Sequence, residues 1–215
     1  MGKRAATSQL ERLTFFSDAV FAIAITLLVI EVHVPHLDTR DDGAYLQALA
    51  ALTPSFMGFA LSFLTIGALW MAHHRVFGLL DIHHERLLWP NMLLLMVVAF
   101  MPFATALMSA NPLARVPELF YAGTLLVAGL LQHWLFRRAL APGLVRPGVP
   151  PEDIAALRWR SLGLPTAAAI AWIVAWWLPA WNDFLLLAIP LLVRLYAGLG
   201  RRRALRRLAA TAPAA

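Results

Sequence analysis

The chain has 215 residues, of which 60% are hydrophobic and only 14% are charged, and its formal net charge is +6. Its mean hydropathy of +0.69 is typical of a protein that crosses a membrane several times and excludes an ordinary soluble domain. The sequence contains no cysteine, which excludes disulfides, thiolate metal sites and thiol nucleophiles.

Six apolar runs are long enough to cross a hydrocarbon core of about 30 Å, which takes roughly 20 residues of helix. They cover residues 13–34, 50–72, 87–110, 119–136, 162–181 and 184–200. The middle four contain no Asp, Glu, Lys or Arg, whereas Arg194 interrupts the last one. No long polar linker separates the runs, so we expect one all-α membrane domain over residues 1–215 with six transmembrane helices.

The cations predict the orientation of these helices. Most of them flank alternate ends of the runs: Lys3, Arg4 and Arg12, then Arg75 and Arg86, then Arg137 to Arg160, then Arg194 to Arg207. The positive-inside rule therefore predicts that both termini are cytoplasmic and that the acidic loop after the first run faces outward. We interpret the C-terminal arginines as partners of anionic lipid headgroups rather than of nucleic acid.

The first run differs from the others because it carries Asp18 and Glu31. A carboxylate in hydrocarbon costs several kcal/mol unless protein groups or water satisfy it. We therefore expect this helix to face other protein or water rather than lipid alone.

Helical periodicity separates the first run into two faces. At 100° per residue, one stripe within about 80° contains Arg12, Phe16, Ala19, Ile23, Leu27 and Ile30, with Thr26 at its margin. Asp18 lies on another side of the helix. Periodicity alone favours ordinary lipid contact or helix packing along the stripe over a functional role.

Arg12, Phe16, Ser17 and Asp18 match an RxxxFSD signature at the start of the first run, and this signature resembles that of the transmembrane protein 175 family of potassium channels. The segment AVFAIAITLLVIEVHVP that follows is similar to the family's first helix throughout. LWMAHHRVF at residues 69–77 and NMLLLMVVAFMPF at residues 91–103 resemble segments of its second and third helices.

The resemblance implies a potassium-preferring cation channel of the prokaryotic plasma membrane, built as a homotetramer whose first helices line a central pore. It implies a narrowest hydrophobic ring at Ile23, further layers at Leu27 and Ile30, and a hydroxyl at Thr26 beside the constriction. Glu31 would lie at the outer mouth. The chain contains no TVGYG-like filter loop, as in that family.

The same resemblance implies a structural polar network that holds the first helix in register. Its members would be Arg12, Phe16, Ser17, Asp18, Trp70, His73 and Asn91. The neighbouring His74 could replace His73, because both lie within helical reach of Trp70.

Two other functions remain open from the residues alone: a proton-coupled transporter that uses Asp18 or Glu31, and a membrane-embedded enzyme. The enzyme is disfavoured because no pair of titratable residues converges in the middle runs and no GxSxG or P-loop motif occurs. The histidines at positions 73, 74, 83 and 84 lack a metal-ligand spacing. We expect no metal and no cofactor apart from the permeant potassium ion.

Overall fold

The computed structural model describes residues 2–178, 185–186 and 188–211. The elements of this part of the chain are α1 (Gly2–Leu27), α2 (Asp42–Ala51), α3 (Thr53–Phe77), the 3₁₀ helix η1 (Glu85–Leu87), α4 (Leu88–Ala110), α5 (Arg115–Ala139), α6 (Pro151–Arg160), α7 (Gly163–Ala175) and α9 (Ile189–Thr211). The predicted all-helical class is therefore confirmed for these residues.

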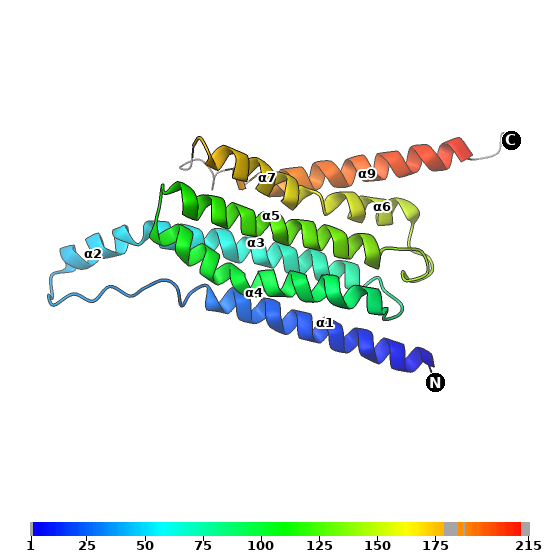
Figure 1. Cartoon of the computed structure of the whole chain (residues 1–215), viewed down its shortest axis with the longest axis horizontal. Helices are drawn as coiled ribbons and strands as arrows, with labels where there is room; N and C mark the ends of the chain where they lie inside the picture. Colours follow the sequence, from blue (N-terminus) through cyan, green and yellow to red (C-terminus); the bar gives the residue numbers. More distant parts are fainter. Residues whose placement is uncertain (1, 179–184, 187, 212–215) are drawn as a thin grey trace.

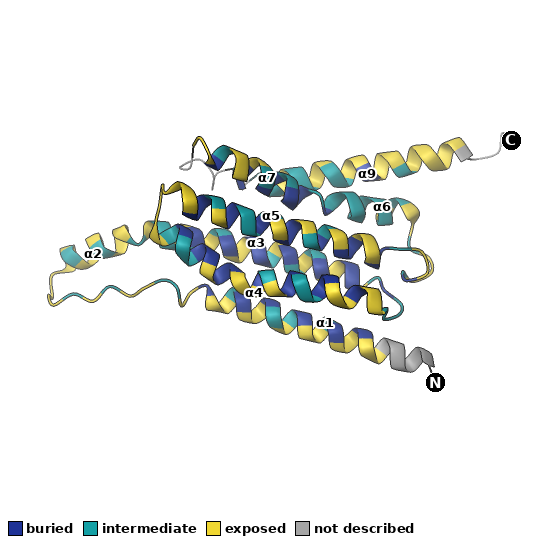
Figure 2. Cartoon of the chain, in the orientation of Figure 1, coloured by how far each residue is buried: buried dark blue, intermediate teal, exposed yellow. Residues whose placement is uncertain are grey.

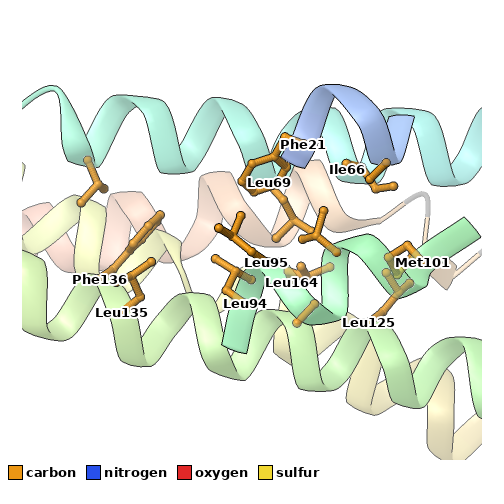
Figure 3. Close-up of a cluster of buried hydrophobic side chains, with 14 of the residues drawn as sticks. Phe21, Ile66, Leu69, Leu94, Leu95, Met101, Leu125, Leu135, Phe136 and Leu164 are labelled. Carbon is orange, nitrogen blue, oxygen red and sulfur yellow. The ribbon is translucent and has the colours of Figure 1, made fainter. Parts of the chain in front are cut away.

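The helices form an elongated bundle (Figure 1). α4 packs against α1, α3 and α5, and α5 continues the bundle to α7. α9 packs along α6 and against α7, so α6, α7 and α9 form the far layer. Buried apolar side chains run through the bundle from Phe21 on α1 to Leu164 on α7 (Figure 3). These contacts fix the side of α1 that faces the rest of the chain.

Two glycines permit close contact between the helices of the far layer and their neighbours. A Cβ on Gly129 of α5 would lie 2.8 Å from the backbone nitrogen of Pro165 in α7, and one on Gly163 would lie 2.8 Å from the Cα of Val193 in α9. Small residues at such crossings let helix backbones approach closely, which stabilises helix pairs in a membrane through van der Waals contact.

Three helical segments of the described chain are long and apolar enough to cross a membrane: Thr53–Phe77, Glu85–Ala110 and Arg115–Ala139. They correspond to the second, third and fourth predicted runs. α3 begins and ends a few residues later than its run of residues 50–72, because Leu52 separates it from α2 and Pro54 lies in its first turn, where proline is tolerated.

The first run, residues 13–34, does not match the helix that contains it. α1 ends at Leu27, and the chain continues in turns in which Ile30 N donates to Leu27 O at 3.1 Å and Val32 N donates to Val29 O at 3.2 Å. Pro35 disfavours helical geometry at Val34, and the β-branched residues before it have low helix propensity. Ile30 and Glu31 thus lie beyond the helix, not within it as predicted.

The last two runs also differ from the helices observed. α7 ends at Ala175, so its 13 helical residues are fewer than the predicted run of residues 162–181, whose end lies outside the described residues. α9 spans Ile189–Thr211 and so continues beyond the predicted end at residue 200, whereas the predicted start at residue 184 lies outside the described residues. Leu, Ala and Arg are all strong helix formers, so the basic tail extends this helix instead of ending it.

Candidate functional site

α1 presents one buried face and one exposed face. Leu13, Ser17, Phe21, Ala24 and Leu28 are buried against the bundle, at the spacing of three or four residues that places side chains on one side of a helix. Exposed residues alternate with them along α1 (Figure 2).

The exposed face contains every residue of the stripe predicted from periodicity: Arg12, Phe16, Ala19, Ile23, Thr26, Leu27 and Ile30. The side chain of Ile23 is 58% exposed, that of Leu27 is 40% exposed and that of Ile30 is 69% exposed. The other helices of the described chain therefore leave this apolar stripe uncovered.

Thr26 is the polar member of the exposed stripe. Its hydroxyl donates to main-chain carbonyls of its own helix, Ile23 O at 2.9 Å and Ala22 O at 3.1 Å. Because the hydroxyl hydrogen is directed at the backbone, the oxygen lone pairs remain available on the exposed side. Thr26 can thus offer an acceptor to a water molecule or a cation beside Ile23.

A chain of buried hydrogen bonds joins α1 to α4 and α3. The hydroxyl of Ser17 donates to Leu13 O at 2.8 Å and accepts from Asn91 Nδ2 at 2.9 Å. On the other side of the amide, Asn91 Oδ1 lies 2.9 Å from His73 Nε2. Because Oδ1 is only an acceptor, His73 Nε2 must carry the proton and donate. Ser17, His73 and Asn91 are all fully buried.

Aromatic rings hold the imidazole of His73 in place. It stacks on Phe77 with ring centroids 4.0 Å apart and packs against Phe21 at 5.6 Å. Its Nδ1 atom is buried without a hydrogen-bond partner among the described residues. His74, the alternative considered from the sequence, is exposed and packs beside the ring of Trp70.

Asp18 is linked to α3 by a separate contact. The indole Nε1 of Trp70 donates to Asp18 Oδ1 at 2.8 Å in a partly buried position. The helix therefore places Ser17 and Asp18 on neighbouring flanks of α1, where Ser17 contacts α4 through Asn91 and Asp18 contacts α3 through Trp70.

Three predicted site residues lie apart from these contacts. Arg12 and Phe16 are exposed and take no part in the hydrogen bonds of Ser17 and Asp18. Arg12 and Phe16 are four residues apart, which places both of them on the same face of α1 as Ile23. Glu31 lies in the turn after α1, where its carbonyl oxygen is 3.0 Å from His33 Nδ1.

The same arrangement of helices occurs in a channel of known structure. A lysosomal potassium-selective channel TMEM175 homologue from Chamaesiphon minutus superposes with a TM-score of 0.69 at 31% identity, over 93% of this chain and 98% of that one. A family model described as endosomal/lysosomal potassium channel TMEM175 matches residues 12–102.

Two curated relatives extend the comparison. A potassium channel from Streptomyces collinus is 35% identical over 173 residues, which are 76% of this chain and 83% of the relative. A potassium channel from Chamaesiphon minutus is 40% identical over 135 residues, or 61% of this chain and 66% of the relative. The chain belongs to the TMEM175 family of potassium channels.

Membership of the TMEM175 family confirms the resemblance read from the RxxxFSD signature. It also confirms the prediction of a channel rather than an enzyme, because the relatives are named as channels. The residues matched by the family model begin at Arg12 and end within α4, so they include the exposed stripe of α1 and all the hydrogen bonds of Ser17, Asp18, Trp70, His73 and Asn91.

Sequence reasoning missed a second buried polar cluster in this TMEM175 chain. The hydroxyl oxygen of Ser62 on α3 lies 2.7 Å from Thr105 Oγ1 on α4 and 2.9 Å from the Tyr121 hydroxyl on α5. Hydroxyl residues are common in membrane helices and often bond to their own backbone, so their presence alone did not indicate a cluster.

Proposed function

We propose that this chain forms a homotetrameric, potassium-preferring channel in which the exposed stripe of α1 lines a central pore. The observation that carries the proposal is the contrast between the two faces of α1. One face is held to α3 by a partly buried hydrogen bond and to α4 by a buried one, and the opposite face exposes Ile23, Leu27 and Ile30. The names of the relatives as potassium channels support potassium as the permeant ion.

Ile23 is the proposed constriction and gate. Four copies of a branched aliphatic side chain around an axis form a ring that water wets poorly, so small changes in radius switch conduction. Leu27, one turn further along α1, would form a second apolar layer. Ile30 lies in the turn after the helix, so its contribution depends on how that turn is placed in the assembly.

Selection among cations would depend on partial dehydration at the Ile23 ring. The hydroxyl oxygen of Thr26 lies on the exposed side of the helix and can replace part of the hydration shell. Outside the ring, Glu31 and the acidic loop with Asp38 and Asp41 would raise the local cation concentration, as a mouth lined by one sign of charge does.

The hydrogen bonds of Ser17 and Asp18 are proposed to set the rotation of α1. A helix that is free to rotate about its axis would turn Ile23 away from the pore. Two polar contacts on neighbouring flanks, one to α4 and one to α3, resist that rotation because breaking either leaves a polar group unsatisfied in a low-dielectric setting. Arg12 and Phe16 would instead face a neighbouring copy at the cytoplasmic end.

The proposed topology has six membrane crossings with both termini in the cytoplasm of a prokaryotic cell, in its plasma membrane. α1, α7 and α9 would supply the crossings beyond the three apolar segments. The basic half of α9, with Arg201 and Arg203, would lie near anionic headgroups, and Arg203 is held 4.4 Å over the ring of Trp159.

The proposal is tested by reconstituting the purified protein in lipid bilayers and recording current with potassium on one side and sodium on the other. We expect resolved current and a reversal potential shifted toward that of potassium. Proton-coupled uptake without resolved current would indicate a carrier instead. Ile23→Ala should raise the current, with Ile25→Ala as the matched control, because Ile25 packs against the core.

A further inference from the structure

A cavity of about 190 Å³ lies between α3, α5 and the far layer of α6, α7 and α9. It is separate from the exposed stripe of α1. Its wall is mainly apolar, and the lining includes Leu64, Ala68, Phe136, Leu164, Ile189 and Val193. Apolar cavities tend to exclude water and accept apolar ligands, so hydrocarbon is the fitting occupant of this one.

Two arginines also line this cavity. Arg75 lies in the last turn of α3, and Arg160 is the last residue of α6. Burial, together with the positive charge of Arg75 nearby, lowers the pKa of Arg160. The described residues supply no ion-pair partner to either guanidinium. Arg160 is partly buried whereas Arg75 is exposed, and two neighbouring like charges of this kind repel each other until an anion joins them.

The other polar groups of the lining are already engaged. Gln132 Nε2 donates to Leu69 O at 2.9 Å, and the Ser161 hydroxyl donates to Arg158 O at 2.7 Å. The first bond ties α5 to α3, and the second closes the C-terminal end of α6, so both stabilise the walls of the cavity. The groups left to bind a ligand are the two guanidiniums, and guanidinium is well matched to phosphate.

The arginines lie at the end of α3 that the positive-inside rule assigns to the cytoplasm. An occupant therefore needs a negatively charged group at the cytoplasmic surface and a hydrocarbon part directed into the bundle. A phospholipid of the inner leaflet has both parts in this order.

We propose that the cavity between α3, α5 and the far layer binds one anionic phospholipid, with its phosphate between Arg75 and Arg160 and an acyl chain among the apolar side chains. The site is independent of the proposed pore, because no residue of α1 contributes to it. Its occupant would join α3 and α5 to α6, α7 and α9.

The test uses the full-length protein, purified in a neutral detergent and stripped of lipid. Its thermal unfolding midpoint is measured against phosphatidylglycerol, phosphatidylcholine and inorganic phosphate, and bound lipid is counted by native mass spectrometry. We expect saturable stabilisation and one bound lipid per chain with phosphatidylglycerol, at a concentration about tenfold or more below that needed for phosphatidylcholine. Equal effects of the two lipids, or the same stabilisation by inorganic phosphate, would overturn the proposal.

Two pairs of variants locate the site. Arg75→Gln with Arg160→Gln should weaken phosphatidylglycerol binding about tenfold or more, whereas Arg201→Gln with Arg202→Gln removes the same charge from an exposed part of α9 and should retain the saturable site. If both double variants lose it equally, the proposal is wrong.

The apolar part of the site is tested without changing any charge. Ala68→Phe fills the cavity and should abolish the saturable stabilisation, whereas Met71→Phe adds bulk to the same helix at an exposed position outside the lining and should leave it intact. Unchanged phosphatidylglycerol binding by the Ala68→Phe variant would contradict the proposal. This test does not depend on whether the arginine variants fold.

Discussion

The indole Nε1 of Trp70 donates to the carboxylate of Asp18 at 2.8 Å, which joins α3 to α1 through a partly buried charge. The helix that would line the pore is thus attached to its neighbour by a contact whose loss leaves a carboxylate without its donor. The buried bond between Asn91 and Ser17, at 2.9 Å, attaches the adjoining flank of α1 to α4.

Trp70→Phe should destabilise the protein. The substitution keeps an aromatic ring but removes the N–H donor, which leaves Asp18 Oδ1 unsatisfied at a cost of about 1–3 kcal/mol. The unfolding midpoint of the purified assembly should fall accordingly. Trp89→Phe is the control, because Trp89 is 74% exposed at the start of α4, and an equal loss there would contradict the role given to Trp70.

Asn91→Leu should be more harmful than its size suggests, because it leaves both the Ser17 hydroxyl and His73 Nε2 without their partner. We expect a loss of about 1–3 kcal/mol from the unsatisfied N–H of His73, and a smaller loss at Ser17, whose hydroxyl still donates to Leu13 O. Adding His73→Phe removes one of these groups and keeps a ring to stack on Phe77. The double variant should therefore recover part of the unfolding midpoint, and strictly additive losses would argue against a shared hydrogen-bonded unit.

Gly129→Ala should separate α5 from α7. Its methyl group would lie 2.8 Å from the Pro165 backbone nitrogen, and backbone cannot move aside as a flexible side chain can. We expect destabilisation of about 1–3 kcal/mol from overpacking, measured as reduced yield of folded protein and a lower unfolding midpoint. Gly198→Ala on α9 meets no atom within 4 Å and should be neutral or slightly stabilising, since alanine favours helix.

Much of the helical framework could be predicted from hydropathy. The run of residues 87–110 follows Arg86 and ends before Asn111 and Pro112, and α4 has nearly the same bounds. The end of α1 could not be predicted in this way. Hydropathy reports a preference for apolar surroundings and remains high through Ile30, whereas helicity also depends on backbone propensity and on Pro35.

The candidate site was only partly accessible to sequence reasoning. Periodicity correctly placed Arg12 and Phe16 on the same face as Ile23, although the family signature grouped them with Ser17 and Asp18 because they are adjacent in sequence. The pairing of Ser17 with Asn91 spans 74 positions, and nothing in the local pattern of either helix specifies it. Only the family resemblance related the two segments.

The cluster of Ser62, Thr105 and Tyr121 illustrates the same limit of local pattern. Each residue lies in a different helix, and none of the three flanking sequences contains a motif that selects the others. Their contact is decided by how α3, α4 and α5 are rotated about their axes, which depends on packing of the complete bundle.

Because the chain contains no cysteine, a single thiol placed at position 23 reports directly on whether Ile23 faces the permeation pathway. Ile23→Cys introduces a single thiol, and reconstituted channels carrying it are exposed to a water-soluble, thiol-reactive cation while potassium current is recorded. If Ile23 lines the pore, the reagent progressively blocks the Ile23→Cys channel and does not block the Ile25→Cys control. The pore position of Ile23 would be contradicted if the reagent left the current of the Ile23→Cys channel unchanged and only lipid-soluble reagents reacted with the thiol.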